Sequence, residues 1–409
     1  MLTLFIASAF ASEITGYSEF RATYSADVDG EAWSVVERFR PTIEAELSEM
    51  ISLSVTVEAN MSQGRWEQYE AWALVDYEIG SILENAGCGF SEPTDRYSSI
   101  DDILGVERLF MDLYTDFADI RIGRQALNWG SAQMLNPTDL FAEVLVAEPW
   151  KERSGVNAIR ANLSVGEAQV AAVAAIDDSL SKAQFGLRPT INVLQTDVSP
   201  VASIDSDGES FAGLDLRGQL GVGWWVEGGT ELGADEGLLP EISVGIDYSF
   251  DIFDGLLFGA QYTYDATGGA DPRYYELSDR GVSLVPVPDC DAAAELFANV
   301  EGGEPRFTIG QHYGLGWARL VINDEWGFTA TGLTNLQDYS SLVIPNLAWT
   351  PGGNWSVNAG AQLLLGEGEF SPTVHMTNVT FGEGASGATV DFDGVIPTWS
   401  AFVWGRYSI

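Results

Sequence analysis

The stretch VERLFMDLYTDFADIRIGRQALNWGSAQMLNPTD, from Val106 to Asp139, decides the fold. It predicts two strands around a tight turn at 115–118, followed by a corner rich in Gly, Asn and Trp. Apolar side chains occupy alternate positions of both strands: Leu109, Met111, Leu113, Ile120 and Ile122. Because successive side chains of a strand point to opposite faces, one face of this hairpin contacts apolar surroundings and the other contacts water. Those surroundings are a second sheet in a soluble sandwich and lipid in a transmembrane barrel.

Segments with the same alternation recur along the chain, and each has roughly the length that a tilted strand needs to cross a bilayer. Together with the central hairpin they predict 18 strands; the others are 13–25, 33–46, 51–60, 154–165, 168–177, 182–190, 191–202, 210–219, 221–231, 241–251, 255–265, 307–322, 325–336, 339–349, 354–365 and 395–409. The division near Pro189 is weakly marked, so 16 strands is the alternative.

The lengths of the connections favour a membrane barrel over a soluble sandwich. Four long insertions, 62–105, 128–153, 266–306 and 366–394, all fall at the same end of an up-and-down barrel, and the shortest turns fall at the other. Outer-membrane barrels have short periplasmic turns and long outer loops. Aromatic residues near strand ends would form the interfacial girdles: Trp33, Trp326, Trp349, Trp355, Trp399 and Tyr407. We therefore predict an all-β, antiparallel transmembrane barrel in the outer membrane of a Gram-negative bacterium.

The ends and the charge of the chain restrict its location and its partners. Residues 1–11, MLTLFIASAFA, are similar to the apolar region and cleavage site of a secretory signal, which leaves 12–409 as a single barrel domain. The 19 Lys and Arg against 60 Asp and Glu give a net charge of −41. This balance argues against nucleic acid and anionic partners, which need basic patches. It fits a surface held by divalent cations or a cation-favouring vestibule, and equally an adaptation to a saline habitat.

The corner itself carries a resemblance. GRQALNWG (Gly123 to Gly130) followed by NPTD (Asn136 to Asp139) resembles the corner of a broad group of Gram-negative outer-membrane barrels related to alginate-export-type porins. The stretch at 327–366 is similar to the C-terminal strands of that group. The resemblance implies an outer-membrane barrel with a pore-like function and does not name a substrate.

The inward positions of the expected strands collect charged side chains. We predict that the pore is lined by Arg38, Arg40, Glu58, Asp112, Arg121, Arg160, Arg188, Arg217 and Asp247. One interpretation is a ladder of arginines facing acidic groups across a constriction, which orients polar or anionic solutes. The other is a set of salt bridges that rigidify the wall, because guanidinium and carboxylate groups match geometrically. Any single residue fits the salt bridge better, and the set fits the pore lining better.

Arg124, Trp129 and Asp139 form a predicted structural corner. Arg124 falls on the apolar side of its strand, where an unpaired guanidinium at the lipid midplane would cost about 2–4 kcal/mol. It is therefore expected at the outer rim, or turned inward by a bulge at Gly123. An ion pair between Arg124 and Asp139 would fold the outer loop back over the mouth of the barrel.

Cys88 and Cys290 lie in insertions that the topology places on the same face. A disulfide between the first and third long loops is therefore predicted, with two free thiols as the alternative.

Catalysis and cofactors have little support in the sequence. The only histidines are His312 and His375. His312 is assigned to an inward position, and no serine motif of a barrel lipase accompanies it. The tracts 27–31, 205–209 and 391–394 offer closely spaced oxygen ligands but lack the terminal Glu of an EF-hand, which makes them Asp-Gly turns or weak Ca²⁺ sites on the outer loops. We expect no enzyme and no cofactor.

The sequence thus predicts a porin-like channel that passes a polar or charged solute across the outer membrane. The alternative is a non-conducting barrel whose acidic loops bind divalent cations or a periplasmic or surface protein. The solute, the direction of transport and the oligomeric state are left open.

Overall fold

The structure is a computed structural model that describes residues 12–26, 31–67, 97–98, 103–141, 153–177, 180–233, 238–269, 308, 310–366, 368–370, 375–379, 388–391 and 399–409. No helix in this described part of the chain is long and apolar enough to cross a membrane. The expected signal segment, both cysteines and the loop tract 27–30 lie outside the described residues.

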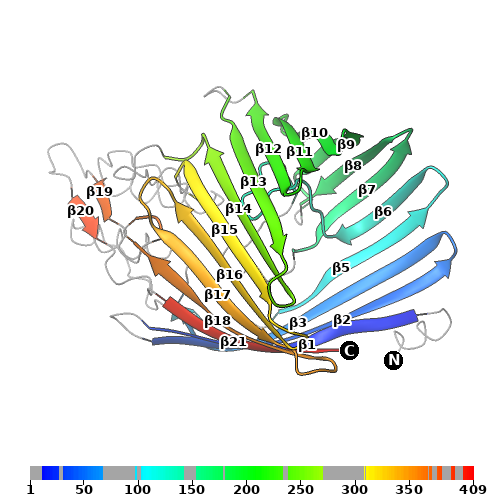
Figure 1. Cartoon of the computed structure of the whole chain (residues 1–409). Coiled ribbons are helices and arrows are strands. Elements are labelled where there is room, and N and C mark those ends of the chain that lie inside the picture. Colours follow the sequence, from blue (N-terminus) through cyan, green and yellow to red (C-terminus); the bar gives the residue numbers. More distant parts are fainter. Residues whose placement is uncertain are drawn as a thin grey trace, which may run out of the picture.

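Eighteen antiparallel strands form the wall, as the alternation predicts (Figure 1). They are β1 (Ser12–Ala26), β2 (Glu31–Ser48), β3 (Ile51–Glu67), β5 (Ile103–Tyr114), β6 (Ala118–Gln125), β7 (Val156–Val165), β8 (Ala168–Ile176), β9 (Ala183–Val193), β10 (Thr196–Asp205), β11 (Ser210–Gln219), β12 (Gly223–Leu232), β13 (Glu241–Phe250), β14 (Gly255–Asp265), β15 (His312–Val321), β16 (Trp326–Asn335), β17 (Ser341–Trp349), β18 (Trp355–Leu365) and β21 (Trp399–Ser408). Short β4 (Tyr97–Ser98) extends the end of β3, and β19 (His375–Val379) and β20 (Ala388–Asp391) form a separate hairpin.

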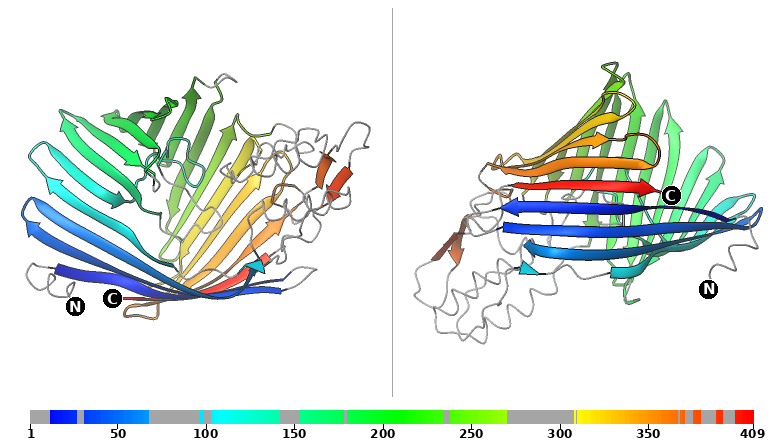
Figure 2. Two further views of the ribbon diagram at one scale, coloured as in Figure 1. Left: turned by 180° about the vertical axis from the view of Figure 1, so that it is seen from behind. Right: turned by 90° about the horizontal axis from the view of Figure 1, so that it is seen from below.

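The first and last strands close the barrel. β21 pairs with β1 from Tyr17 opposite Ser408 to Ser25 opposite Ser400, and with β18 on its other side. Figure 2 shows β1 and β21 side by side when the barrel is seen from below. Closure leaves no strand edge without a hydrogen-bonding partner, which is what a sheet in lipid requires.

The turn between β9 and β10 lies a few residues after the division at 190/191 that the sequence predicts. Pro189 lies inside β9, and the turn falls at Leu194 and Gln195, whose φ angles are 53° and 66°. The pairing of β9 with β10 runs in one register on both sides of Pro189, but the pairs around Pro189 and Pro200 are missing. Since neither proline has an N–H to donate, this local gap looks like a strand end in the sequence although the strand continues.

The outer surface of the wall is apolar and ends in aromatic rings. Exposed side chains such as Phe39, Ile159 and Phe258 alternate with buried or half-buried neighbours. At the end with the short turns, Trp326 stacks on Trp349 with ring centroids 5.8 Å apart, and Trp355 contacts Tyr407. At the other end lie Tyr24, Trp33 and Trp399. This arrangement of a lipid-facing band between two girdles is typical of outer-membrane barrels.

Candidate functional site

The connection from β6 to β7 does not stay at the rim but enters the barrel (Figure 2). We call its described part, residues 126–141, the constriction loop. Trp129 and Phe141 meet edge to face at 4.9 Å and are buried against the inner wall. Gly186 on β9 makes room for them, because a Cβ atom there would lie 2.7 Å from the Phe141 ring and 2.8 Å from the Trp129 ring. Burial of both rings therefore fixes the start and the end of the loop on the wall.

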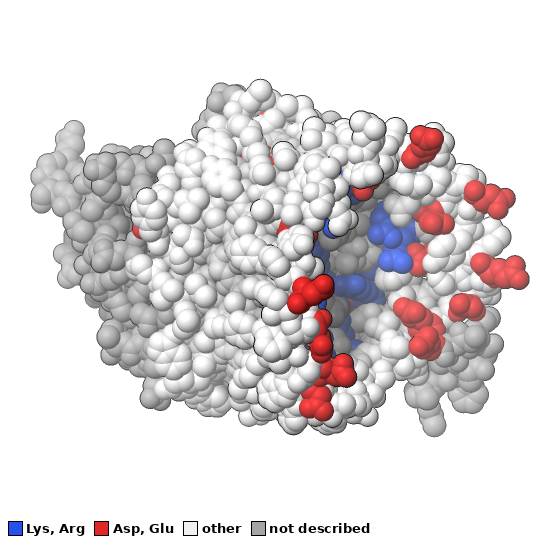
Figure 3. All heavy atoms as spheres, in the orientation of Figure 1, with Lys and Arg blue, Asp and Glu red and all other residues white. Residues whose placement is uncertain are grey.

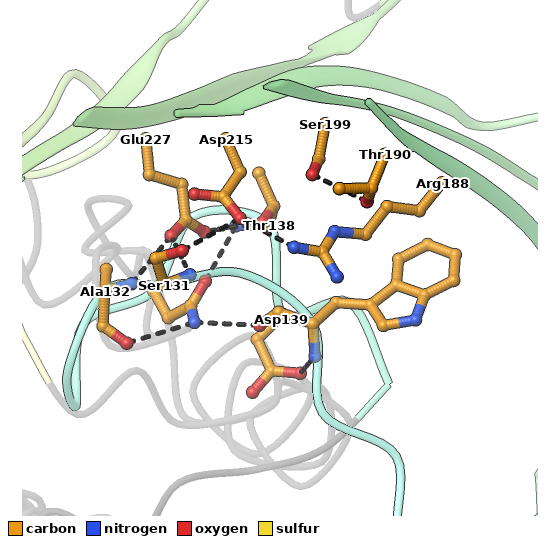
Figure 4. Close-up of polar contacts among 11 residues, drawn as sticks. Ser131, Ala132, Thr138, Asp139, Arg188, Thr190, Ser199, Asp215 and Glu227 are labelled. Carbon is orange, nitrogen blue, oxygen red and sulfur yellow. Dashed lines mark hydrogen bonds and ion pairs between the residues drawn. The ribbon is translucent and has the colours of Figure 1, made fainter. Parts of the chain in front are cut away.

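A single carboxylate on β12 holds the middle of the loop (Figure 4). The backbone N–H groups of Ser131 and Ala132 both donate to Glu227 Oε2 at 2.8 Å. The backbone N–H and the hydroxyl of Thr138 donate to Oε1 at 2.9 and 2.5 Å. Glu227 is fully buried. Four donors therefore satisfy both oxygens, which is how a buried charge becomes tolerable.

Gly130 explains why the loop can approach this carboxylate so closely. Its φ is +81°, and a Cβ atom at this position would lie 2.2 Å from Glu227 Oε1 and 2.4 Å from Asn136 Oδ1. Only glycine fits such a contact, in a backbone conformation that side chains disfavour.

An amide on β14 makes a second anchor. Gln261 accepts from the N–H of Gln133 at 2.8 Å and donates to the carbonyls of Gln133 and Leu135 at 3.0 and 2.9 Å. The hydroxyl of Ser243 on β13 also donates to the Leu135 carbonyl, at 3.0 Å. These contacts pair the backbone polar groups of a loop that has no regular secondary structure of its own.

Asp215 on β11 joins the loop to an arginine of the wall. It accepts from the Ser131 hydroxyl at 3.0 Å and forms an ion pair with Arg188 at 2.7 Å through the same oxygen, Oδ2 (Figure 4). Two carboxylates, Asp215 and Glu227, thus contact Ser131, while one guanidinium lies beside them.

Asp139 closes the loop on the side toward β7. It accepts from the Trp129 N–H at 3.2 Å and forms an ion pair with Arg153. Burial raises the pKa of the Asp139 carboxyl above its usual value, against the lowering effect of Arg153. The structure thus joins Trp129 to Asp139 by a hydrogen bond and gives Asp139 the ion-pair partner Arg153; a structural corner of Arg124, Trp129 and Asp139 stays a prediction. The pairing of Asp139 with Arg124 stays a prediction.

Arg124 is the penultimate residue of β6, at the rim expected for it. Gly123 has a φ of +125°, but the register between β5 and β6 continues through it without a bulge. The Arg124 side chain lies against Gly155, where a Cβ atom would be 2.8 Å from Arg124 Cγ.

The wall formed by β21, β1, β2, β3, β5, β6 and β7 carries the charged side chains. Arg38 lies 3.8 Å from Glu19 and 3.5 Å from Glu58, and Arg40 lies 3.7 Å from Glu58. Arg406 on β21 reaches Glu19 at 2.7 Å, which joins the last strand to the first. Figure 3 shows Lys and Arg side chains in the hollow of the barrel and Asp and Glu side chains at its rim.

Arg121 and Arg160 stand next to each other on β6 and β7 but differ in their partners. Arg121 binds Asp112 through two hydrogen bonds of 2.6 and 2.9 Å and stacks over Phe110 at 3.8 Å. Arg160, opposite Arg121 in the register, has no carboxylate within ion-pair distance in the described part of the chain, and its Nε has no hydrogen-bond acceptor there. Arg121 is thus neutralised locally and Arg160 is not.

Arg217 and Arg319 share this property with Arg160. Both are exposed on inward positions of β11 and β15, and neither forms an ion pair among the described residues. Asp247, on β13, lies over Gly223, whose Cβ would be 2.3 Å from Asp247 Oδ1. The predicted pore residues are therefore not one cluster: the structure brings Arg38, Arg40 and Glu58 together and pairs Asp112 with Arg121, whereas Arg217 and Asp247 lie elsewhere on the wall.

The wall opposite the arginines is apolar on its inner side. Tyr313, Leu315, Leu333, Leu342, Ile344, Phe370 and Phe402 form a buried cluster. Met134 and Leu135 of the constriction loop pack against it. The loop therefore lies against the inner face of β15–β17.

His312 corrects the assignment of its strand face. We expect it inside the barrel, but its ring lies between Tyr262 and Tyr264, and its Nδ1 is 2.7 Å from the Tyr262 hydroxyl, on the outer side. The next residue, Tyr313, points inward and is 1% exposed. Gly314 and Gly316 occupy the outward positions of β15, so the usual contrast between an apolar outside and a polar inside is reversed and misleads the assignment.

The carboxylates of the tract 205–209, considered above as weak Ca²⁺ ligands, bind the ammonium group of Lys182. Lys182 Nζ lies 3.0 Å from Asp205, 3.6 Å from Asp207 and 3.3 Å from Glu209. Hydrogen bonds to Asp205 and Glu209 raise the pKa of Lys182. The N–H groups of Asp207 and Glu209 donate to Asp205, as in an Asp-Gly turn. Within the described residues, no group of three or more His, Cys, Asp or Glu could hold a metal ion.

Sequence reasoning misses the residues that anchor the loop. Glu227, Ser243 and Gln261 are isolated polar residues on inward positions of three consecutive strands, β12, β13 and β14. The signal available in the sequence is that each is flanked by large apolar residues or glycine, but nothing local connects them to residues 126–141, which are about a hundred positions away.

Comparison with known proteins supports the fold. No family model matches the sequence, and no curated protein matches it. Among solved structures, that of Pseudomonas aeruginosa OpdQ is similar with a TM-score of 0.56 at 9% identity, covering 97% of this chain and 98% of that one. P. aeruginosa OccK11 (OpdR) gives 0.53 at 8%, covering 98% and 96%. P. aeruginosa OccK2 (OpdF) in complex with glucuronate gives 0.52 at 11%, covering 97% and 98%.

These likenesses show the fold of an 18-stranded outer-membrane porin over almost the whole chain. The neighbours are Occ and Opd porins, and they give no support to the relationship with alginate-export-type barrels that the corner motif suggests.

Proposed function

We propose that this protein is a channel of the outer membrane that passes a small polar solute carrying a negative charge. The observation that carries the proposal is the inner wall: Arg160, Arg217 and Arg319 have no carboxylate partner within the described residues, while the constriction loop is held in the lumen by β11–β14 and packs against β15–β17. Unpaired guanidinium groups at the wall of an aqueous pore attract anionic groups and hydrogen-bond them.

The location follows from the same features. The apolar outer face and the two aromatic girdles fit a bilayer. The ends of the barrel differ, because every long connection lies at one of them. In outer-membrane barrels such loops face the outside of the cell, so we place the short turns in the periplasm.

The neighbours agree with this choice of solute without establishing it. OccK2 was crystallised with glucuronate, a polar sugar acid. The paired arginines Arg38, Arg40, Arg121 and Arg188 also lie on the inner wall, and we propose that they position the solute together with the unpaired ones. Glu58, Asp112 and Asp215, which pair with them, would keep these arginines apart and oriented.

The test is single-channel recording of the purified, folded protein in planar bilayers, combined with swelling of liposomes in glucuronate and in the neutral sugar glucose. We expect steady openings and faster swelling in glucuronate. A folded barrel that stays silent in both assays would leave the non-conducting, surface-binding barrel as the better interpretation, since part of the lumen is already filled.

A further inference from the structure

The constriction loop is held in the lumen by contacts that converge on one side chain. Of its anchors, Glu227 receives four hydrogen bonds from residues 131–138, whereas Asp215 receives one from the same segment. Both ends of the segment, at Ser131 and at Thr138, meet at this carboxylate. Release of Glu227 would therefore free both ends of the turn, while Gln133 and Leu135 between them keep their bonds to Gln261 and Ser243.

Every group that faces the Glu227 carboxylate from the loop is a donor. Three are backbone N–H groups, which cannot accept, and the Thr138 hydroxyl donates at 2.5 Å. A protonated or amidated side chain would bring its own donor against these N–H groups. Four donors thus match an ionised carboxylate, which offers only acceptors.

The charged groups around this carboxylate come from the wall and not from the loop. Asp215 on β11 interacts electrostatically with it, and Arg188 on β9 pairs with Asp215. On β13 the residue opposite Glu227 is Ser243, and Glu241 lies opposite Gly229. The loop contributes no charged side chain to the contact, so its N–H groups are what compensates the second negative charge.

We propose that Glu227 is a positioning residue that sets the bore of the pore, because its ionised carboxylate holds the constriction loop in the lumen. The consequence for the bore rests on the proposed channel function; the hold on the loop does not. When Glu227 is neutral, the two ends of the turn at Ser131 and Thr138 leave β12 and the bore widens there.

The direct test is hydrogen–deuterium exchange of the full-length protein in detergent, read by mass spectrometry on peptides that cover 129–139. Since a hydrogen bond to a charged group is worth roughly tenfold in equilibrium, Glu227→Gln should speed exchange in this segment by about a hundredfold or more. Peptides from 241–265 should exchange as in the unsubstituted protein.

Glu19→Gln is the matched control. Glu19 is also a buried carboxylate of the inner wall and its substitution changes the charge equally, but its partners are Arg38 and Arg406 and not the loop. It should leave exchange at 129–139 unchanged. Equal protection of this segment in Glu227→Gln and in the unsubstituted protein would overturn the proposal.

Thr138→Val is the second variant in case Glu227→Gln does not fold, as judged by heat-modifiable migration. It removes one of the four donors and keeps the carboxylate, so exchange should rise by roughly tenfold. Conductance of the same variants then separates the two ideas. If the unsubstituted protein is silent but exchange responds as expected, the proposed channel function fails and the hold on the loop stands. If the unsubstituted protein conducts and exchange does not respond to the substitutions, the hold of Glu227 on the loop fails and the proposed channel function stands.

Discussion

Replacing Arg160 with Gln should make the channel less selective for anions. Arg160 has no carboxylate within ion-pair distance in the described part of the chain, and Asp112, which acts on it electrostatically, is already paired with Arg121. An anion passing at about 6 Å, with an effective dielectric constant of about 40–80, would lose roughly 0.7–1.4 kcal/mol of attraction. A cation would lose an equal repulsion, so the anion-to-cation permeability ratio should fall by about ten- to hundredfold.

The measurement is the reversal potential of single channels in a planar bilayer under a gradient of KCl. Lys182→Gln is the control, because it removes the same charge from an exposed outer loop. At 0.1 M salt the Debye length is about 10 Å, so a charge at the rim should not shift the potential of the constriction. If Arg160→Gln leaves the reversal potential where it was, or if both variants shift it equally, the selectivity does not arise from the unpaired arginine.

Two further outcomes test the packing and the loop. Leu333→Ala should destabilise the barrel by about 2–5 kcal/mol, because Leu333 is 1% exposed within the inner cluster. Leu347→Ala, on the lipid-facing side, should lower the stability much less. Unfolding of both variants in guanidinium, followed by heat-modifiable migration, measures the difference. The Asp139 carboxyl should titrate above its usual 3.8, since burial raises its pKa, and the folded protein should therefore lose stability as the pH rises from 3.8 through that higher value. Carbon NMR of labelled aspartate checks this, and a midpoint at or below 3.8 would contradict it.

The fold could be predicted from the sequence because a membrane barrel repeats one simple constraint. Each strand needs an apolar outward face, and each end needs either a short turn or a long loop, so the same pattern returns 18 times. Local errors do not accumulate, since each strand is identified independently. The misplaced turn at Pro189 shifts one boundary by a few residues and leaves the count unchanged.

The inner face could be predicted only in part. Alternation identifies the inward positions of Arg38, Arg121 and Arg160, but it does not say which guanidinium has a carboxylate beside it. That depends on the stagger between strands, which places Asp112 opposite Arg121 and leaves Arg160 next to another arginine. Register between neighbouring strands is set by turns and bulges and is not visible in the composition of either strand.

In β15–β17 the large apolar residues face the lumen, contrary to the usual pattern, and the physical cause lies outside these strands. Their inward residues Tyr313, Leu333 and Ile344 are apolar because the constriction loop, and not water, covers them. Sequence periodicity assumes that the inside of a wide barrel is wet. Where a loop fills the lumen, large apolar residues face inward and glycine faces lipid, as Gly314 and Gly316 do, so the parity of His312 is misassigned.

The position of the loop also explains how a chain with a net charge of −41 can present positive charge to a solute. The turns at the end of the barrel opposite the long insertions contain no Lys or Arg. Their acidic residues are Glu49, Asp116, Glu167, Asp251, Asp254, Asp324 and Glu325. These carboxylates lie at the mouth, in water, where salt screens them over about 10 Å. Inside, Met134 and Leu135 pack the loop against the apolar wall, which Arg160 on β7 does not belong to. In a narrow, partly desolvated passage, charges act more strongly than at a hydrated rim, so the anion selectivity that we propose would come from the few arginines without an ion pair among the described residues, although carboxylates outnumber them in the chain.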